Sequence, residues 1–317
     1  MKKLNEEDII GIFQKELGNS KFASEDVEIF RLKKIPIVAK IDTLVASTDI
    51  PTGMKLQEAI RKSVVACVSD FSVKGVKPSY GIVSLTIPTK FSKTKIIELA
   101  NGLARAAKEF NFKILGGDTN EGKELVIQTC IFGTAKKIVQ RKGAKVNEII
   151  ITTGPFGYSS AGLKIILDKK KANRKFFQKA KNATFRPIPR LKFGLQNRRY
   201  FSSSMDSSDG LAITLHEMSR QSKKKFVITK LPANSDLFEF AKMNRINPME
   251  LIFYGGEEYE MVATVSRKNL TLVKRNALVQ KIPLFEIGYV SNGKGVVYTD
   301  KKKIKKIKKK GWLHFES

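Results

Sequence analysis

The chain is poor in cysteine: it has only Cys67 and Cys130, which lie far apart, each within an apolar segment. No Cys-x-x-Cys pair occurs, so the sequence predicts no zinc site of that type. Two isolated thiols indicate free, buried cysteines and a reducing, cytoplasmic setting. The chain also lacks any apolar run of about 18 residues, which predicts that no segment spans a membrane. The first residues lack the apolar core of a signal peptide, so we expect no secretion signal.

Acidic residues are scarce as well. The chain has 30 Asp and Glu against 59 Lys and Arg, which gives a formal net charge of +29. Such a balance suits nucleic acid, anionic surfaces or anionic substrates. Because the positive charge is spread along the whole chain, we expect a Lys-rich background and no nucleic-acid partner. The length of 317 residues, 42% of them hydrophobic, predicts two domains or one large one, with a sizeable core.

The order of apolar patterns predicts a mixed α/β (α+β) fold. Helical spacing covers residues 4–17, 56–68, 93–110 and 211–220, and strand patterns cover residues 27–30, 35–42, 80–87, 113–115, 125–133, 149–153 and 261–265. The pattern changes near residues 143–148, where a buried strand and a Gly-rich turn follow. We therefore expect an N-terminal domain over residues 1–145 and a C-terminal domain over residues 146–317.

Two acidic stretches stand out against the basic background. They are Gly116-Gly117-Asp118-Thr119-Asn120-Glu121-Gly122 and Asp206-Ser207-Ser208-Asp209-Gly210. Each places carboxylates beside glycine and hydroxyl residues, next to an apolar segment. Carboxylates at tight glycine turns suit Mg²⁺, which takes oxygen ligands and shares them with substrate phosphates. The sequence therefore favours phosphate chemistry.

Further aspartates lie at predicted strand or helix ends beside Ser or Thr, namely Asp26, Asp42, Asp49 and Asp70. Singly, each is commonly a cap or a turn residue. Together they would converge only if they shared a cation. Several Mg²⁺ ions held in this way support direct phosphoryl transfer from a nucleotide to an anionic acceptor. In that mechanism the protein supplies positioning and electrostatics, and no side chain forms a covalent intermediate.

One segment nearly matches a phosphate-binding P-loop, from Gly288 to Gly295. The P-loop pattern requires Ser or Thr after its lysine to hold Mg²⁺, and here Gly295 follows Lys294. A strand-like run over residues 296–299 stands where the helix of a P-loop would begin. The sequence therefore predicts a hairpin turn, and ATP, if bound, must be held by other residues.

Seven motifs occur together in one order along the chain. They are Asp42-Thr43-Leu44-Val45-Ala46, Val68-Ser69-Asp70, Gly116-Gly117-Asp118-Thr119, Arg141-Lys142-Gly143-Ala144, residues 154–163, residues 206–211 and Gly255-Gly256-Glu257-Glu258-Tyr259-Glu260. With the ending Lys310-Gly311-Trp312-Leu313-His314-Phe315, this set resembles the thiamine-monophosphate kinases, of the aminoimidazole-ribonucleotide-synthetase-like superfamily. The resemblance runs from about Asp26 to Phe315.

The resemblance implies a two-domain synthetase-like fold whose N-terminal sheet forms a homodimer. It also implies ATP-dependent phosphorylation of thiamine monophosphate to thiamine diphosphate, with several Mg²⁺ ions. Carried over by position, the metal ligands are Asp26, Asp42, Asp70, Asp118, Asp206 and Asp209. The ATP-binding residues are Gly117, Asp118, Arg141 and Ser208. The substrate-binding residues are Asp49, Glu257 and Trp312, whose indole suits the cationic thiazolium.

Four departures from the family pattern bear mainly on the substrate side. Ser24-Glu25-Asp26 stands where the family has Gly-Asp-Asp, and Ile41 stands where a threonine ligand is common. Asp49 stands at the place of a substrate-contacting histidine, and Glu258 stands at the place of an aspartate.

Two alternatives stay open. One is another ATP-dependent enzyme of the superfamily, such as an aminoimidazole-ribonucleotide or selenophosphate synthetase. A selenophosphate synthetase requires a reactive Cys or Sec near the N-terminus, and this chain has none there. The ending at Trp312 argues against an aminoimidazole-ribonucleotide synthetase. The other alternative is a catalytically silent, basic nucleic-acid-binding protein on the same fold, which the complete set of aspartates disfavours.

Overall fold

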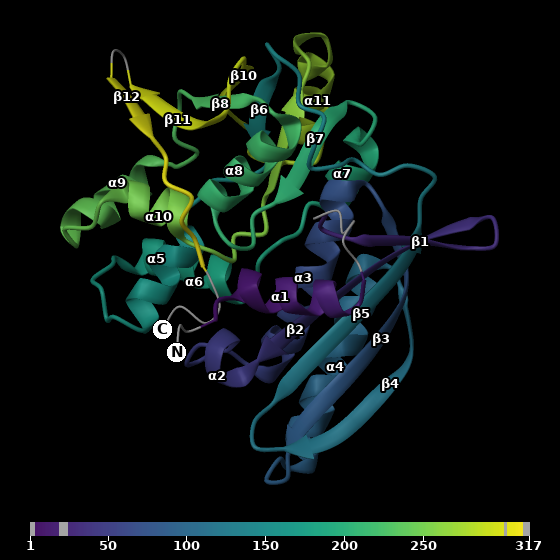
Figure 1. Ribbon diagram of the computed structural model, residues 1–317. Coiled ribbons are helices and arrows are strands. Elements are labelled where there is room, and N and C mark those ends of the chain that lie inside the picture. The colour runs from purple at the N-terminus through teal and green to yellow at the C-terminus, as the bar shows by residue number, and fades with distance from the viewer. Residues whose placement is uncertain (1–3, 19–24, 301–302, 313–317) are drawn as a thin grey trace.

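The computed structural model describes residues 4–18, 25–300 and 303–312 of the chain. Within these residues the protein contains two separate β-sheets, one of five strands and one of seven, with helices packed against both (Figure 1). The predicted mixed α/β (α+β) fold class is therefore confirmed. None of the helices in these ranges combines the length and the apolar character needed to cross a bilayer.

The first half of the chain builds the five-stranded sheet, in the order β1-β2-β5-β3-β4. The strand bounds are Glu28–Leu32 (β1), Ile35–Val45 (β2), Lys77–Pro88 (β3), Lys113–Gly122 (β4) and Val126–Thr134 (β5). β3 and β4 pair in parallel, and the other neighbours pair antiparallel. Because side chains alternate between the faces of a strand, β2 turns Val38 and Leu44 into the core and leaves Ile41 exposed.

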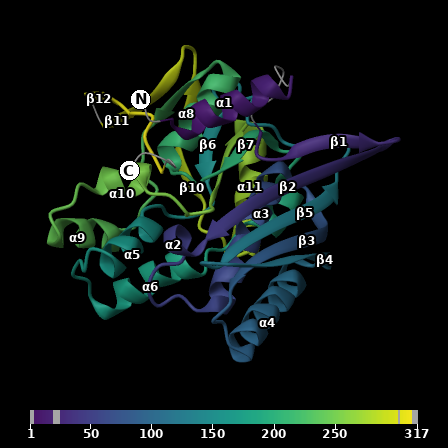
Figure 2. The same ribbon diagram turned by 60° about the horizontal axis from the view of Figure 1, so that its bottom comes forward.

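Two long helices, α3 (Leu56–Lys74) and α4 (Lys93–Phe110), lie together on one face of this sheet. Figure 2 shows α4 beneath the strands. The opposite face carries exposed apolar side chains on β2 and β3, namely Ile41, Tyr80 and Ile82. A sheet face of this kind normally packs against a partner, because apolar surface is stabilised by removal from water.

The second half builds the seven-stranded sheet, in the order β12-β11-β8-β10-β6-β9-β7. The strand bounds are Ile149–Thr152 (β6), Phe201–Asp206 (β7), Lys225–Ile228 (β8), Met261–Val265 (β9), Phe285–Ser291 (β10), Gly295–Asp300 (β11) and Lys303–Lys306 (β12). The helix bounds are Tyr158–Ile166 (α5), Arg174–Phe185 (α6), Leu191–Asn197 (α7), Leu211–Ser222 (α8), Ser235–Met243 (α9), Pro248–Tyr254 (α10) and Arg267–Val279 (α11). Both faces are covered: Ile150 packs with α5, α8 and α10, while Ile149 and Ile151 pack with α7 and α11.

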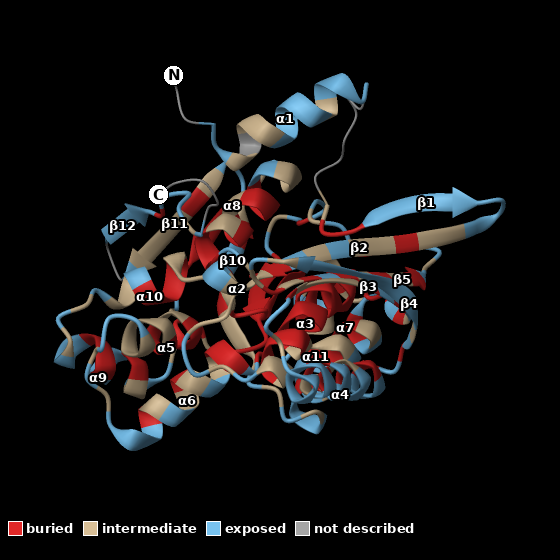
Figure 3. Ribbon diagram, turned by 90° about the horizontal axis from the view of Figure 1, so that it is seen from below, coloured by how far each residue is buried: buried red, intermediate tan, exposed pale blue. Residues whose placement is uncertain are grey.

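Helix α3 joins the two halves. It is buried along almost its whole length, including the charged side chains of Asp70 and Lys74. Val64 belongs to the core beneath the first sheet, and Val73 belongs to a core shared with the second sheet. Because a buried charge is stable only when it is paired, Asp70 and Lys74 must find partners inside the molecule. Two further helices are α1 (Glu6–Glu16), which projects from the body of the protein (Figure 3), and the short α2 (Ala46–Asp49).

The first acidic stretch is not the tight turn that the sequence predicted. The strand expected over residues 113–115 continues through Gly122 as β4, paired with residues 82–88 of β3. Gly117 is required by this pairing, because a Cβ there would lie 1.7 Å from the carbonyl oxygen of Val83. Pairing with a distant strand has overridden the local turn preference of the glycines.

The predicted hairpin between Gly288 and Gly295 is also wrong, although strand β11 does follow it in place of a P-loop helix. β10 and β11 both pair with β8, which lies between them. β8, which comes much earlier in the chain, thus lies between two strands that are neighbours in sequence. No local sequence pattern predicts this arrangement. The other predicted helices and strands are present, and the helix predicted over 56–68 continues to Lys74.

Candidate active site

A cavity of about 370 Å³ lies between the two halves of the molecule. Its walls come from β2, α2, α3, the turn that follows β7 and the loop that precedes β9. Most of the predicted site residues line it, namely Asp42, Asp49, Asp70, Asp206, Ser208, Asp209, Glu257 and Trp312. The fold therefore gathers into one place residues that are widely separated along the chain.

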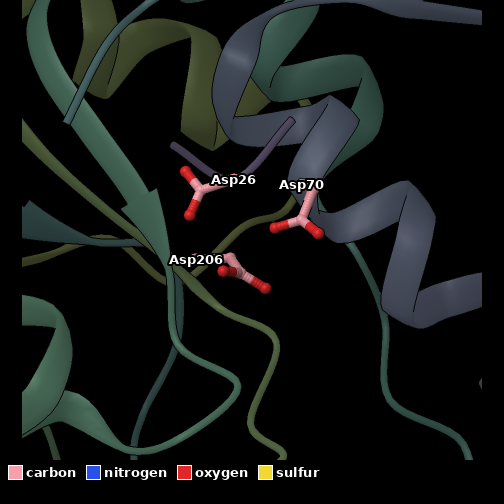
Figure 4. A group of neighbouring side chains, drawn as sticks. All are labelled: Asp26, Asp70 and Asp206. Atoms are coloured by element: carbon pink, nitrogen blue, oxygen red, sulfur yellow. The ribbon is translucent and has the colours of Figure 1, made fainter. Parts of the chain in front are cut away.

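Three buried aspartates, here called the aspartate triad, meet beside this cavity (Figure 4). Asp26 precedes β1, Asp70 lies on α3 and Asp206 is the last residue of β7. Each offers one carboxylate oxygen, and these three oxygens lie within 4.8 Å of one another. Carboxylate oxygens brought this close together suit shared divalent cations.

Burial and mutual repulsion act on the pKa values of the triad. Burial raises the pKa of Asp70 well above its ordinary value, against the pull of Lys40, and the charges of Asp206 and Asp26 add to the rise. Burial and the charge of Asp26 raise the pKa of Asp206 to about 6. For Asp26, burial also acts to raise the pKa, but Lys74 and Arg141 outweigh it and lower the pKa. Carboxylates that repel one another in this way favour the binding of cations.

Three basic side chains surround the triad. Lys74 is fully buried on α3, and its Nζ lies 2.6 Å from Oδ2 of Asp26. Lys40 on β2 places its Nζ 2.8 Å from Oδ2 of Asp70. Arg141, which the family resemblance assigns to an ATP phosphate, donates from Nε to Oδ1 of Asp26 at 2.8 Å and does not line the cavity. Neither lysine belongs to the site predicted from the sequence.

Periodicity is the signal by which these lysines could have been found. On β2, the two-residue period puts Lys40 on the same face as Asp42. On α3, a spacing of four residues puts Lys74 one turn after Asp70, on the same side of the helix. Lysine is rarely buried, so neither position suggested a place inside a site.

Two further predicted ligands border the cavity beside the triad. Burial raises the pKa of Asp42, whose Oδ2 lies 3.7 Å from Nζ of Lys40. Burial and the charge of Asp206 raise the pKa of Asp209 to about 6. Each of these carboxylates is therefore held in a form that gains from a nearby cation.

The donor set of the site fits Mg²⁺. Every candidate ligand is a carboxylate, which is the oxygen donor that Mg²⁺ prefers in proteins. Oδ2 of Asp26 is buried, and Nζ of Lys74 lies 2.6 Å away. Burial first, and then the charges of neighbouring carboxylates, raise the pKa values of Asp70, Asp206 and Asp209.

Gly117 and Asp118 are not brought to the cavity. Asp118 lies in one cross-strand row with Ser84, Gln128 and Thr43, which runs over β4, β3, β5 and β2. Three strand spacings of about 4.8 Å separate the two ends of this row, or about 14 Å.

The row of Asp118 also faces the open side of the sheet. The adjacent row contains Leu44 and Ile127, which are buried against the helices, so side-chain alternation turns the row of Asp118 outward. Asp118 is exposed there, and its carboxylate accepts a hydrogen bond from Asn120 at 2.7 Å. In the single chain, Asp118 and Asp42 thus point to opposite faces of the same sheet.

The three predicted substrate residues line the cavity. Oδ2 of Asp49 accepts the backbone N–H of Val45 at 2.6 Å. Oε1 of Glu257 lies 2.5 Å from Nζ of Lys62. Trp312 is 53% exposed, and its backbone N–H donates to the carbonyl oxygen of Asp209 at 3.0 Å. His314, part of the family-like ending, lies outside the described residues.

Lys62 is a further residue to which the sequence analysis assigned no role. Its side chain, on α3, is 2% exposed. Besides contacting Glu257, its Nζ donates to the backbone carbonyl of Asp49 at 3.1 Å. Lys62 therefore ties the α2 segment of the first half to the loop before β9 in the second half.

That loop is also anchored to the Gly-rich turn of the second half. Oε1 of Glu258 accepts the backbone N–H groups of Gly157 at 2.7 Å and Ser159 at 3.1 Å. These groups lie at the start of α5, where the helix dipole favours an acidic side chain. Glu257, next to it, has a positive φ of 62°, a conformation that a non-glycine residue keeps only when its surroundings hold it. Two motifs that are distant in sequence thus support each other.

We predict that Lys62→Met destabilises the protein by about 2 kcal/mol, because it leaves the Glu257 carboxylate beside a buried apolar group. Glu257→Gln in the same background is expected to recover part of this loss, since the unpaired charge is then gone. A double-mutant cycle of urea unfolding without ligands measures the coupling, with Lys93→Met at the exposed start of α4 as control. A coupling free energy below about 0.5 kcal/mol would contradict the role given to this pair.

Comparison with known proteins points to one family. Residues 24–135 match the family model described as AIR synthase related protein, N-terminal domain. The thiamine-monophosphate kinase of Nitrosopumilus maritimus is 56% identical to the chain, over 99% of this chain and 100% of that kinase. The chain belongs to the thiamine-monophosphate kinase family. The resemblance inferred from the ordered motifs is therefore confirmed.

Two further similarities extend over the whole chain. The thiamine-monophosphate kinase of Pyrococcus horikoshii is 30% identical, over 100% of this chain and 98% of that protein. The structure of AaThiL complexed with AMPPCP and TMP matches with a TM-score of 0.86 at 25% identity, and the match covers 99% of this chain and 98% of that one. Both halves described above, and the cavity between them, thus fall within the family's fold.

Proposed function

We propose that the chain transfers the γ-phosphate of ATP to thiamine monophosphate, which yields thiamine diphosphate and ADP. The observation that carries this proposal is the convergence of Asp42, Asp209 and the aspartate triad around one cavity. Full-length relatives bear the name thiamine-monophosphate kinase. AaThiL, which shares the fold, has an ATP analogue and TMP bound.

The proposed mechanism needs no general base. Asp26, Asp42, Asp70, Asp206 and Asp209 would hold Mg²⁺, which when bound would supply the positive charge that phosphoryl transfer between two anions requires. The acceptor is a phosphate oxygen, which is already largely deprotonated at neutral pH because the second pKa of a phosphate monoester is about 6. The protein's own contribution is to hold and orient the two anions.

The two halves contribute different parts of this site. Asp42 and Asp70 come from the first half, while Asp206, Ser208 and Asp209 come from the second. We assign Ser208 to the nucleotide, as the family resemblance implies. Arg141 acts as a positioning residue in this proposal, because its guanidinium orients the carboxylate of Asp26.

An assay with ATP, Mg²⁺ and thiamine monophosphate tests the proposal. We expect thiamine diphosphate and ADP in equal amounts, separated and quantified by chromatography. Thiamine serves as the matched control acceptor, because it lacks the phosphate that receives the new bond. The proposal would be contradicted if thiamine monophosphate yielded no thiamine diphosphate while another acceptor was turned over.

Trp312→Ala is expected to raise KM for thiamine monophosphate about tenfold and to leave KM for ATP unchanged. The reason is the loss of an indole face for the cationic thiazolium, an interaction worth about 1–2 kcal/mol. Trp312→Phe keeps an aromatic face and should show a smaller rise. Steady-state kinetics with each substrate varied in turn measure both effects, and an unchanged KM for thiamine monophosphate would remove Trp312 from the substrate site.

We also propose a homodimer in which the five-stranded sheets pack through their open faces. Ile41 and Ile82 lie in one row with Cys130 on this face, and both isoleucines are exposed in the single chain. A two-fold axis along the strands would place β4 of one sheet over the β1–β2 side of the other. In such a dimer, the partner subunit's Asp118 is proposed to complete the cavity, which would account for a predicted metal-binding aspartate that lies outside the cavity of its own chain.

We keep the domain boundary between residues 145 and 146. β5 ends at Thr134 and β6 begins at Ile149, and the segment between them contains no helix or strand. A cytoplasmic location is proposed on the ground that Cys67 and Cys130 are both unpaired, since reduced thiols are typical of that compartment.

A further inference from the structure

The ammonium group of Lys40 lies among the carboxylates that are predicted to bind metal. Its Nζ is 2.8 Å from Oδ2 of Asp70 and 3.7 Å from Oδ2 of Asp42. The side chain points into the molecule because β2 alternates, with Val38 and Leu44 buried on the same face. Lys40 also lines the cavity itself, so its charge faces the space where the phosphates of a substrate would lie.

Lys40 remains charged in this position. The ordinary pKa of a lysine is about 10.4, and carboxylate oxygens of Asp70 and Asp42 lie 2.8 and 3.7 Å from its Nζ. A lysine ammonium is a compact point charge with three donors. Placed between two carboxylates, it contacts both of them, as a bridging cation does.

The other two cations of the cluster have a different place. Lys74 is fully buried and pairs with Glu25 at 2.7 Å and Asp26 at 2.6 Å, and it donates to the carbonyl oxygen of Ser204 at 3.1 Å. Arg141 also pairs with Asp26. Neither residue lines the cavity. They neutralise the far side of the triad, whereas Lys40 neutralises the side that opens to the substrate.

We propose that the ammonium group of Lys40 takes the place of one divalent cation between Asp42 and Asp70. The proposal rests on the proposed function of this site, and it makes Lys40 a positioning and charge-supplying residue for the two anionic substrates. A fixed ammonium excludes a second cation from the same spot, because like charges at a few ångströms repel strongly in a buried site. The chain therefore binds one ion fewer than its aspartates alone would hold, and the region between Asp42 and Asp70 stays assembled without Mg²⁺.

Lys40→Thr tests this by removing the ammonium and leaving room and an oxygen donor for an ion. Mn²⁺ is the probe, and bound ions are counted by electron paramagnetic resonance in the presence of a non-hydrolysable ATP analogue. We expect one additional Mn²⁺ per chain in Lys40→Thr relative to wild type. The control is Lys77→Thr, which removes a charge from an exposed position of β3 in the same sheet and should leave the count unchanged.

Thermal unfolding gives a second readout that does not depend on turnover. In EDTA, Lys40→Thr and Lys40→Met are expected to melt at lower temperature than wild type, because Asp42 and Asp70 then repel each other unscreened. Adding MgCl₂ should restore most of that loss in Lys40→Thr and less in Lys40→Met, which offers no oxygen. Recovery of folding by Mg²⁺ supports the proposal even if Lys40→Thr is unfolded in EDTA.

Equal Mn²⁺ counts in wild type and Lys40→Thr would overturn the proposal. If neither variant folds under any condition, an anomalous map of wild-type crystals with Mn²⁺ decides: an ion bridging Asp42 and Asp70 overturns the proposal, and none there supports it. Failure of the proposed function is distinct, because it appears as absence of thiamine diphosphate with the wild-type protein. The ion count is measured without any reaction.

Discussion

Asp206→Asn is expected to reduce kcat for thiamine diphosphate formation by at least about 1,000-fold. A carboxylate that holds ions at the reacting phosphates contributes several kcal/mol to the transition state, and each 1.4 kcal/mol is about tenfold in rate. Asp206 reaches the triad from β7 in the second half of the chain. Asparagine has nearly the same shape and can still accept the 2.6 Å hydrogen bond from Ser69, but it brings no charge.

The same substitution is expected to stabilise the metal-free protein at neutral pH. Folding raises the pKa of Asp206 from 3.8 to about 6, so folding favours its protonated form. That contribution to stability is complete below about pH 3.8 and is lost as the pH rises through 6. Asparagine stays neutral throughout. In EDTA, the advantage of the variant should therefore grow between about pH 4 and 7, to at most about 3 kcal/mol.

Activity assays and urea unfolding across this pH range, on the same preparations, check both effects. The matched control is Asp168→Asn, at an exposed aspartate that pairs with Lys164, and it should change neither quantity. Activity above a tenth of wild type in Asp206→Asn would exclude Asp206 as an ion ligand. A variant that is less stable than wild type in EDTA at neutral pH would contradict the account of repulsion within the triad.

Asp118→Asn is expected to be as inactive as Asp206→Asn, although Asp118 is exposed and about three strand spacings from β2 in its own chain. The proposed dimer explains the loss, because each cavity is completed by the partner subunit's Asp118. Mixing the two inactive variants should then restore activity. In a mixed dimer, the chain with intact Asp206 receives the intact Asp118 of the other chain, so one of its two cavities is complete.

Random reassociation makes about half of the dimers mixed, so we expect about a quarter of wild-type activity after dissociation and reassociation. An equal mixture of Asp206→Asn and Asp70→Asn is the control. Each chain supplies both Asp70 and Asp206 to its own cavity, so in this mixed dimer each of the two cavities lacks one aspartate. That mixture should stay inactive. No recovery with Asp118→Asn, in a protein shown to be dimeric, would place Asp118 outside the reaction or within its own chain's cavity.

The sequence predicted the long elements well where the pattern is local. The helix over residues 93–110 and the strand over residues 261–265 match the observed bounds, because amphipathic spacing and alternation depend only on near neighbours. The prediction from sequence was wrong where a strand pairs with another strand that is distant along the chain. Residues 116–122 pair with β3 and are therefore part of a strand, and β8 lies between β10 and β11. In both places, glycines that normally signal a turn lie in strands, where the backbone of the neighbouring strand approaches closely.

The sequence by itself determined the family and the mixed fold, and it predicted the acidic residues of the candidate site. Those properties reside in residue types and spacings, which folding does not change. Only the tertiary structure decided which charges meet: Lys40 with Asp70, Lys74 with Asp26, and Lys62 with Glu257. It also decided that Asp118 lies on the open face of its sheet. The physical reason is that burial and ion pairing arise from contacts between segments far apart along the chain, and a lysine carries no local mark of whether it will face water or a buried carboxylate.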